Sequence, residues 1–402
     1  NNLTSASGQL IHSGITIIEP STGNIVAMVG GRDYYADNQH TNHAITQRQT
    51  GSAFKAFTLA TAIDQGMNPG IIINCNSPQT FDDGSYKVSN YDDHSYGYIS
   101  LARATEVSAN TGYVQVAKAV GIQNVIDMCH NLGIDDEMNA YSSLTLGTKE
   151  LSTLQMAEAY STFAMGGEHR DAVAITEIQN RNGEVIYQHE DSPERVLDAS
   201  VAAEINDILE GVISSGTATG AQLSVNQPFA GKTGTTEAPS DLWFCGYTPQ
   251  YTMAVWTGHS GSNQRVTVNG RRARTSDLPI PIARNFFNTV LDGVEREEFP
   301  AADGQITYQD DSVWEVDGKP LSGGGSEAIT PETETVVENE GTGTEAESTT
   351  TQESPTSPVT SPSEPATTPE PGPDPDPDPS PDPSPDSPVG PGTGTGTGDG
   401  QS

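Results

Sequence analysis

The sequence predicts an α+β fold in which one antiparallel β-sheet is flanked by helices and a helical lobe is inserted into the middle of the chain. Strand-like runs lie near the start and around residues 229–257, whereas helical periodicity dominates between them. Composition changes abruptly after residue 320, so the fold has to be built from the residues before that point. Strands at both ends with helices between them are typical of an α+β domain rather than of alternating βα units.

The strands of this sheet are expected at both ends. Residues 14–19 and 25–29 are β-rich and flank a Pro-Ser-Thr-Gly-Asn turn at 20–24. Successive antiparallel strands are expected over residues 229–236, 242–247 and 251–257. An Asn182-Gly183 pair between two further short runs predicts a hairpin with a two-residue turn.

The helices are expected in the middle and at the end. From Ser52 on, apolar residues recur at helical spacing up to Gly66, so a helix is expected to begin near Ser52. Further helices are expected over residues 101–104, 113–120, 125–132, 153–164, 199–213 and 280–291.

The last residues differ from the rest. Residues 321–402 contain no aromatic residue, no Lys and no Arg. Such a segment cannot bury enough apolar area to offset the entropy lost on ordering, so a disordered acidic tail is predicted. The chain carries 54 acidic and 18 basic residues, and the tail accounts for 16 of the acidic ones. The remaining negative charge argues against nucleic acid or an anionic membrane as a direct partner.

The three cysteines, Cys75, Cys129 and Cys245, form no Cys-x-x-Cys pair. Three buried thiols are favoured over one disulfide and a free thiol, because free Cys behaves as a small hydrophobe. No apolar run approaches the length of a membrane span. His40 and His43 lack a supporting cluster, so no metal and no other cofactor is expected.

Ser52-Ala53-Phe54-Lys55 lies at the expected helix start. Residues three apart share a helix face, so the Ser52 hydroxyl and the Lys55 amine can meet. A serine hydroxyl is a weak nucleophile until a base removes its proton, and a neutral lysine can be that base. Taken alone, however, a helix cap beside a surface lysine explains the pair better.

Two more motifs change this interpretation. Ser108-Ala109-Asn110 lies at a loop–helix junction, and Lys232-Thr233-Gly234-Thr235 lies in an expected strand. There a glycine would let a substrate backbone approach closely, and Lys232 offers a cation for a carboxylate. In this order the three motifs resemble the set found in penicillin-binding proteins and class A β-lactamases.

The flanking residues sharpen the resemblance, notably residues 27–31, 48–55, 110–115, 156–167 and 231–236. Over roughly residues 14–295 the chain resembles the transpeptidase domain of a class A, bifunctional penicillin-binding protein. This implies the fold shared by penicillin-binding proteins and serine β-lactamases. The sequence lacks that family's amino-terminal glycosyltransferase domain and membrane anchor and begins at Asn1, so it is interpreted as a fragment or processed product.

The resemblance implies a role for each motif residue. Ser52 would attack the penultimate D-Ala carbonyl of a peptidoglycan stem peptide, with Lys55 as the base. Ser108, with Lys232 nearby, would relay a proton to the leaving nitrogen. The substrate would be held by Asn110, Thr233, Gly234 and Thr235, and the backbone N–H groups of Ser52 and Thr235 would form the oxyanion hole. An amine of a second stem peptide would take the acyl group, and β-lactams would trap the same serine.

Two alternatives stay open. A serine β-lactamase or D,D-carboxypeptidase would pass the acyl group to water, although neither Glu150 nor Glu158 lies in a convincing loop for activating that water. A non-catalytic β-lactam receptor or cell-wall-binding module would keep all three motifs.

The predicted organisation has four parts: a leader at 1–13, a transpeptidase domain at 14–296, a connecting segment at 297–320 and the tail at 321–402. The resemblance implies action at the extracytoplasmic face of a bacterial membrane, held there only through the missing anchor.

Overall fold

The computed structural model describes residues 8–33, 35, 40–236 and 238–321. Residues 1–7 of the predicted leader lie outside the described residues, as does the predicted disordered tail except for Leu321. The predicted limits of the leader, domain, connecting segment and tail stay predictions.

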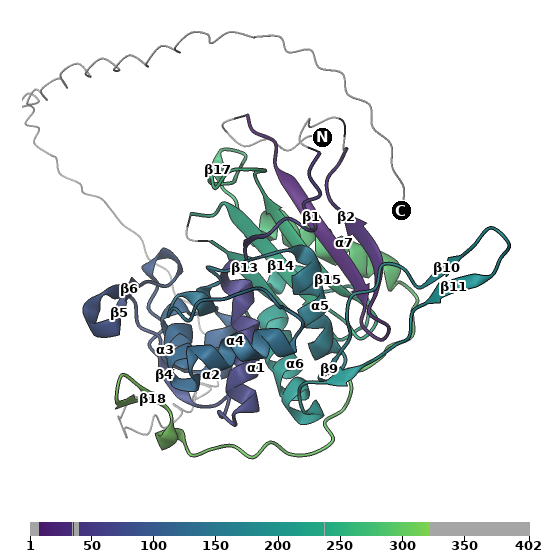
Figure 1. Ribbon diagram of the computed structural model, residues 1–402. Coiled ribbons are helices and arrows are strands. Elements are labelled where there is room, and N and C mark those ends of the chain that lie inside the picture. The colour runs from purple at the N-terminus through teal and green to yellow at the C-terminus, as the bar shows by residue number, and fades with distance from the viewer. Residues whose placement is uncertain (1–7, 34, 36–39, 237, 322–402) are drawn as a thin grey trace, which may run out of the picture. The chain divides into compact units, whose positions relative to one another are not determined.

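A five-stranded antiparallel sheet has the order β13-β14-β15-β1-β2 (Figure 1). Its strands are β1 (His12–Glu19), β2 (Asn24–Val29), β13 (Ala230–Thr235), β14 (Asp241–Tyr247) and β15 (Thr252–Gly258). β1 pairs with β15 in a register that sets His12 opposite Gly258, so both ends of the domain contribute to one sheet. The predicted sheet is confirmed.

Helices cover both faces of this sheet. Every residue of β14 and β15 is buried, and successive side chains of a strand point to opposite faces. Helix α5 (Thr153–Ala164) packs on β1, β14 and β15, and α7 (Pro279–Val290) packs on β14 and β15. Helix α6 (Ala199–Ser214) packs on β13 and on the helical lobe.

The inserted lobe is built around α1 (Lys55–Asp64). Its other helices are α2 (Leu101–Glu106), α3 (Asn110–Val120) and α4 (Ile122–Asn131). Helix α1 is buried over nine consecutive residues, Lys55 to Ile63, because α3, α4 and α6 surround it. The helices predicted in this region are present.

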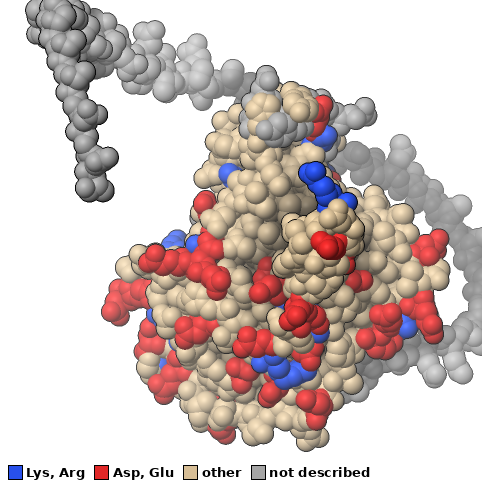
Figure 2. Space-filling model, turned by 45° about the vertical axis from the view of Figure 1, so that its right-hand side comes forward, with Lys and Arg blue, Asp and Glu red and all other residues tan. Residues whose placement is uncertain are grey.

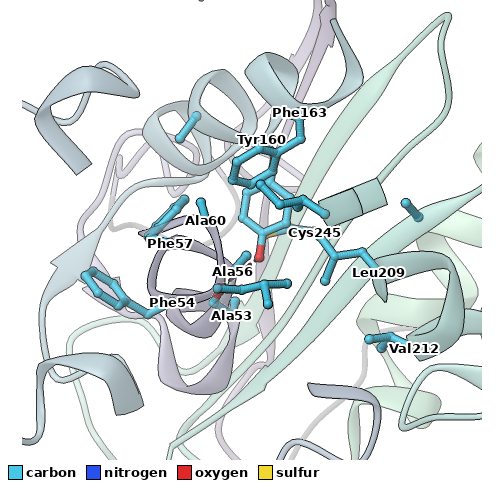
Figure 3. Packing of buried hydrophobic residues seen from close by; sticks show 14 of the residues in the cluster. Ala53, Phe54, Ala56, Phe57, Ala60, Tyr160, Phe163, Leu209, Val212 and Cys245 are labelled. Carbon is cyan, nitrogen blue, oxygen red and sulfur yellow. Dashed lines mark hydrogen bonds between the residues drawn. The ribbon is translucent and has the colours of Figure 1, made fainter. Parts of the chain in front are cut away.

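An aromatic cluster joins the lobe to α5 (Figure 3). The rings of Phe57 and Tyr160 meet edge to face with centroids 5.8 Å apart, and the Tyr160 hydroxyl donates a hydrogen bond of 2.7 Å to the Ala53 carbonyl. Full burial of one such aromatic side chain contributes roughly 2–3 kcal/mol. The helix start around Ser52 is therefore anchored from behind by a well-packed core.

Short strand pairs complete the domain. Their members are β3 (Arg48–Gln49), β4 (Ile72–Asn74), β5 (Gln79–Phe81), β6 (Tyr86–Val88), β7 (Tyr98–Ser100), β8 (Glu150–Leu151), β9 (Glu168–His169), β10 (Glu177–Gln179), β11 (Val185–Gln188), β12 (Glu194–Arg195), β16 (Thr267–Val268), β17 (Arg271–Arg272), β18 (Glu315–Val316) and β19 (Lys319–Pro320).

The hairpin of β10 and β11 differs from the predicted one in its turn. The N–H of Asn180 donates to the Glu184 carbonyl, so Arg181, Asn182 and Gly183 form the loop and the predicted two-residue turn is wrong. The Asn180 side chain accepts from the N–H groups of Asn182 and Glu184 and stabilises this longer loop.

The predicted connecting segment packs on the helical lobe. The N–H of Gln309 donates to the Gly66 carbonyl at 2.8 Å, and the Asp317 carboxylate lies 2.9 Å from the Lys118 amine. Trp314 and Leu321 are buried in the main hydrophobic core. Residues 297–321 therefore belong to the packed structure.

Three further sequence predictions concern bulk properties. Cys75, Cys129 and Cys245 are all free and buried, as favoured above. None of the helices in the described residues is both long and apolar enough to cross a bilayer. Acidic side chains outnumber basic ones over much of the face drawn in Figure 2.

Candidate active site

Ser52 lies in η1 (Gly51–Phe54), a single 3₁₀ turn that leads directly into α1. This turn packs tightly against β13, and two glycines make the approach possible. A Cβ on Gly51 would lie 2.7 Å from the Thr235 carbonyl carbon, and one on Gly234 would clash with the Thr50 carbonyl oxygen. Gly51 also has φ +53°, a conformation that costs glycine little. The half-buried Ser52 side chain is thereby held beside the Lys232–Thr235 strand.

Lys55, the first residue of α1, is fully buried, and its Nζ contacts the Ser108–Asn110 motif. It donates hydrogen bonds to the Ser108 carbonyl at 2.8 Å, to Asn110 Oδ1 at 2.7 Å and to Ser108 Oγ at 3.2 Å. Burial lowers the pKa of Lys55 well below its ordinary value, the charge of Lys232 lowers it further, and Cys75 opposes the shift. The site therefore shifts the Lys55 amine toward its neutral state, which is the state a base requires.

Lys232, on β13, approaches the same hydroxyl from the other side. Its Nζ lies 2.9 Å from Ser108 Oγ, and its side chain is fully buried. Burial lowers the pKa of Lys232 to about 7, partly opposed by Cys245. Cys245 is its direct cross-strand neighbour on β14. A serine hydroxyl has one proton and two lone pairs, so Ser108 Oγ can accept from both lysines and still has its own proton to donate.

The loop between α2 and α3 holds Ser108 in an unusual backbone conformation. Ser108 has φ +58°, in the left-handed region that non-glycine residues rarely adopt and that costs about 1–3 kcal/mol. This conformation accompanies the placement of Ser108 Oγ between the two lysines.

The Asn110 amide is occupied at both ends by the protein. Its Oδ1 accepts from Lys55, and its Nδ2 donates to the Ser89 carbonyl at 2.9 Å. Asn90 lies beside it and accepts from the N–H of Thr111 at the start of α3. Sequence reasoning missed Asn90, because a single Asn in a polar loop has no distinctive spacing.

Thr233, Gly234 and Thr235 lie on β13, the edge strand of the sheet. The Thr233 hydroxyl is 2.7 Å from that of Thr217, which follows α6. Thr217 was also missed, since Gly-Thr-Ala after a helix is an ordinary loop sequence. The structure thus brings the elements of all three motifs together at one place.

Comparison with known proteins accounts for this arrangement. Residues 13–275 match the family described as the penicillin binding protein transpeptidase domain. The chain belongs to this family. The resemblance inferred from the three motifs is confirmed, and relatives named penicillin-binding protein 1A support the class A assignment.

Two of these relatives show the extent of the match. Penicillin-binding protein 1A of Aquifex aeolicus is 32% identical over 292 residues, which cover 72% of this chain and 39% of the relative. The protein of the same name from Rickettsia bellii is 29% identical over 336 residues, which cover 74% of this chain and 42% of the relative. The chain spans about two-fifths of the length of these penicillin-binding proteins.

Solved penicillin-binding proteins share the fold. PonA1 of Mycobacterium tuberculosis in complex with penicillin V is 26% identical with a TM-score of 0.66, over 74% of this chain and 82% of PonA1. Penicillin-binding protein 1A of Haemophilus influenzae, at 21% identity and TM-score 0.66 over 75% of this chain and 53% of its own, supports the fold alone.

Proposed function

We propose that this chain is the D,D-transpeptidase part of a class A penicillin-binding protein, which cross-links peptidoglycan stem peptides through an acyl-enzyme on Ser52. The observation that carries the proposal is the convergence of two buried lysines on Ser108 Oγ, at 3.2 and 2.9 Å, beside the turn that bears Ser52. Family membership and the penicillin V complex of PonA1 support the same conclusion.

Acylation begins when neutral Lys55 takes the Ser52 hydroxyl proton. The Ser52 oxygen then forms a bond with the penultimate D-Ala carbonyl carbon, and the backbone N–H groups of Ser52 and Thr235 stabilise the oxyanion. The C–N bond to the terminal D-Ala breaks. Ser108 gives its proton to that leaving nitrogen and regains one from Lys55, with which it shares a hydrogen bond. Lys55 is neutral again at the end of this step.

The terminal carboxylate of the donor peptide binds at β13. Lys232 supplies positive charge there, and the Thr233 and Thr235 hydroxyls donate hydrogen bonds. As an edge strand, β13 can also pair with the extended peptide backbone, for which Gly234 leaves room. Asn110 keeps Lys55 in place through Oδ1, and the second Nδ2 proton, beside the one given to the Ser89 carbonyl, can be donated to the side-chain amide of the substrate.

Deacylation runs the same path in reverse with a new nucleophile. An amine of a second stem peptide attacks the acyl carbon and loses its proton through Ser108 and Lys55, and Ser52 leaves with a proton from Lys55. A hydrolytic role is less well supported, because Glu158 faces His169 and Asp171 and Glu150 is exposed to solvent. We place this reaction at the extracytoplasmic face of the bacterial membrane, where peptidoglycan is assembled.

Intact mass spectrometry after benzylpenicillin treatment tests the proposal. One added penicillin mass is expected on Ser52, stable for many minutes to hours, absent in Ser52→Ala and unchanged in the exposed-serine control Ser214→Ala. Incubation with a D-Ala-D-Ala peptide and an amine acceptor should give cross-linked product. Rapid penicillin turnover would instead identify a β-lactamase, hydrolysed peptide a carboxypeptidase, and a stable adduct without peptide transfer a receptor.

A further inference from the structure

Glu158, His169 and Asp171 converge away from the three catalytic motifs. Glu158 lies on α5, His169 on β9, and Asp171 two residues later. The Nε2 atom of His169 is 3.8 Å from Glu158 Oε1 and 3.5 Å from Asp171 Oδ1. One ligand atom from each residue falls within 4.8 Å of the other two. Both nitrogen–oxygen distances are longer than an ordinary hydrogen bond. The three atoms therefore face one another with a space between them.

The His169 imidazole is held through Nδ1, and its other nitrogen, Nε2, faces the two carboxylates. His169 is only 8% exposed, and its Nδ1 lies 3.2 Å from the Thr162 hydroxyl. With the Nδ1 proton donated to this hydroxyl, Nε2 carries the lone pair that points at the carboxylates. Within the described residues, Nε2 makes no hydrogen bond of its own.

The backbone around the two carboxylates is fixed independently of any ion. The Val173 N–H donates to the Gly23 carbonyl at 2.8 Å in the turn between β1 and β2, and the Ile25 N–H donates to the Val173 carbonyl at 2.9 Å. Gly133 leaves the space on the remaining side, because a Cβ there would lie 2.6 Å from the His169 ring and 2.7 Å from Glu158 Oε1.

Positive charge is scarce at this cluster. In the described part of the chain, the ion pairs of Glu158 and Asp171 involve no Lys or Arg, and the nearby Arg170 is engaged by Glu168 and Asp191. Two carboxylates therefore share one imidazole, an arrangement that a divalent cation would neutralise.

We propose that Glu158, His169 and Asp171 bind one divalent transition-metal ion of the zinc class. One imidazole nitrogen and two carboxylate oxygens suit such an ion, whose bonds to them are about 2.0–2.2 Å long. Tetrahedral ligands at that distance are about 3.3 Å apart. The nitrogen–oxygen separations of 3.5 and 3.8 Å need only a small contraction, and the two carboxylate oxygens, which lie within 4.8 Å of each other, would move together by rotation of the exposed Asp171 side chain. Three protein ligands leave a fourth position for water. The ion would tie α5 to β9 and to the β1–β2 turn.

Titration of the untagged full chain, stripped with a chelator, with zinc chloride tests the assignment. Calorimetry should show one zinc ion bound per chain, and cobalt in its place should give the visible absorption of a site with nitrogen and oxygen ligands. Asp171→Asn should weaken zinc binding at least tenfold, and His169→Gln should abolish it. The Asp171 side chain is 90% exposed, so its replacement should leave the fold intact, which an unchanged penicillin adduct would verify.

His189→Gln and Glu190→Gln are the control variants, since they remove a half-buried histidine and an exposed carboxylate from the same part of the chain. Both should bind zinc as the unaltered chain does. Absence of stoichiometric binding would overturn the proposal. Equal affinity in Asp171→Asn and in the controls would also overturn it, and would leave Glu158, His169 and Asp171 as an ion-pair cluster.

Discussion

Lys55 and Lys232 are buried at a cost in folding stability, and the same burial lowers their pKa values toward the range that catalysis needs. Each sits in surroundings that disfavour its charge, and each finds its hydrogen-bond partners within the same small group of residues. A lysine with a reference pKa of about 10.4 would be a poor base at neutral pH, and burial removes that obstacle.

Lys55→Ala should lower the rate of acylation by benzylpenicillin by roughly 10²–10⁴-fold, because it removes the proposed base for Ser52. Stopped-flow or mass-spectrometric rates measure the effect. Lys87→Ala, at an exposed lysine on β6, should leave the rate unchanged. A loss of less than tenfold in Lys55→Ala would mean that another group takes the Ser52 proton.

Lys232→Met should destroy carboxylate recognition while it raises the free energy of unfolding by roughly 1–4 kcal/mol at pH 7. The folded-state pKa of about 7 lies far below the unfolded value, so the unfolded chain binds more protons between pH 7 and about 10.4. The stability of the unaltered protein should therefore rise with pH across that window, and the advantage of the variant should shrink. Urea unfolding at pH 7 and pH 9.5 measures both. A pH-independent difference would contradict the buried-charge explanation.

The same pKa predicts a pH effect on substrate selection. As pH rises through about 7, Lys232 loses its charge, so kcat/KM should fall for donors that carry the terminal carboxylate but not for analogues without it. If kcat/KM changed with pH in the same way for both substrate classes, Lys232 would not be the group that binds the carboxylate.

Between elements, the contact of η1 with β13 sets the geometry of the site. Gly234→Ala would push a Cβ into the Thr50 carbonyl and to within 3.1 Å of Ala53, so the strand and the nucleophile turn must separate. Misplacement on the ångström scale is expected to cost on the order of 10²-fold in acylation rate. Gly31→Ala is the matched control, because nothing lies within 4 Å of its Cβ position. The rate of penicillin labelling and the melting temperature are measured for both variants. A Gly234→Ala protein that is labelled at the normal rate would show that the contact is not critical.

Most elements followed from the sequence because their signals are local. Periodicity placed α5 at residues 153–164, as observed, and the three motifs located the site through resemblance. Features that depend on contacts distant in sequence could not be predicted. The position of Thr217 beside Thr233 depends on how α6 ends against β13, and the Glu158–His169–Asp171 cluster depends on the return of the chain from α5 to β9. The turn of the β10–β11 hairpin was missed because the Asn180 side chain, rather than Asn182-Gly183, determines its length.

For the molecule as a whole, residues after 321 are expected to be dispensable for stability, whereas residues 297–321 are expected to contribute to it. Deletion of residues 322–402 should leave the melting temperature and the acylation rate unchanged, because that tail has the composition of a disordered segment. Deletion from residue 297 should lower the melting temperature by several degrees, since it removes Trp314, Leu321 and the ion pair of Asp317. Equal melting temperatures for the two truncations would show that the segment adds no stability.

The pairing of β1 with β15 also governs when the domain can fold during synthesis. β1 is bordered by β2 on one side and β15 on the other, and it is made well before β15, since β15 ends only at Gly258. Until then neither edge of the β1–β2 hairpin is paired with another strand of this sheet, because β2 is also the outer strand of the finished sheet, and contacts so distant in sequence form slowly. Until the later strands have been synthesised, the exposed hairpin can pair with other molecules. We therefore expect the nascent protein to need chaperones during synthesis.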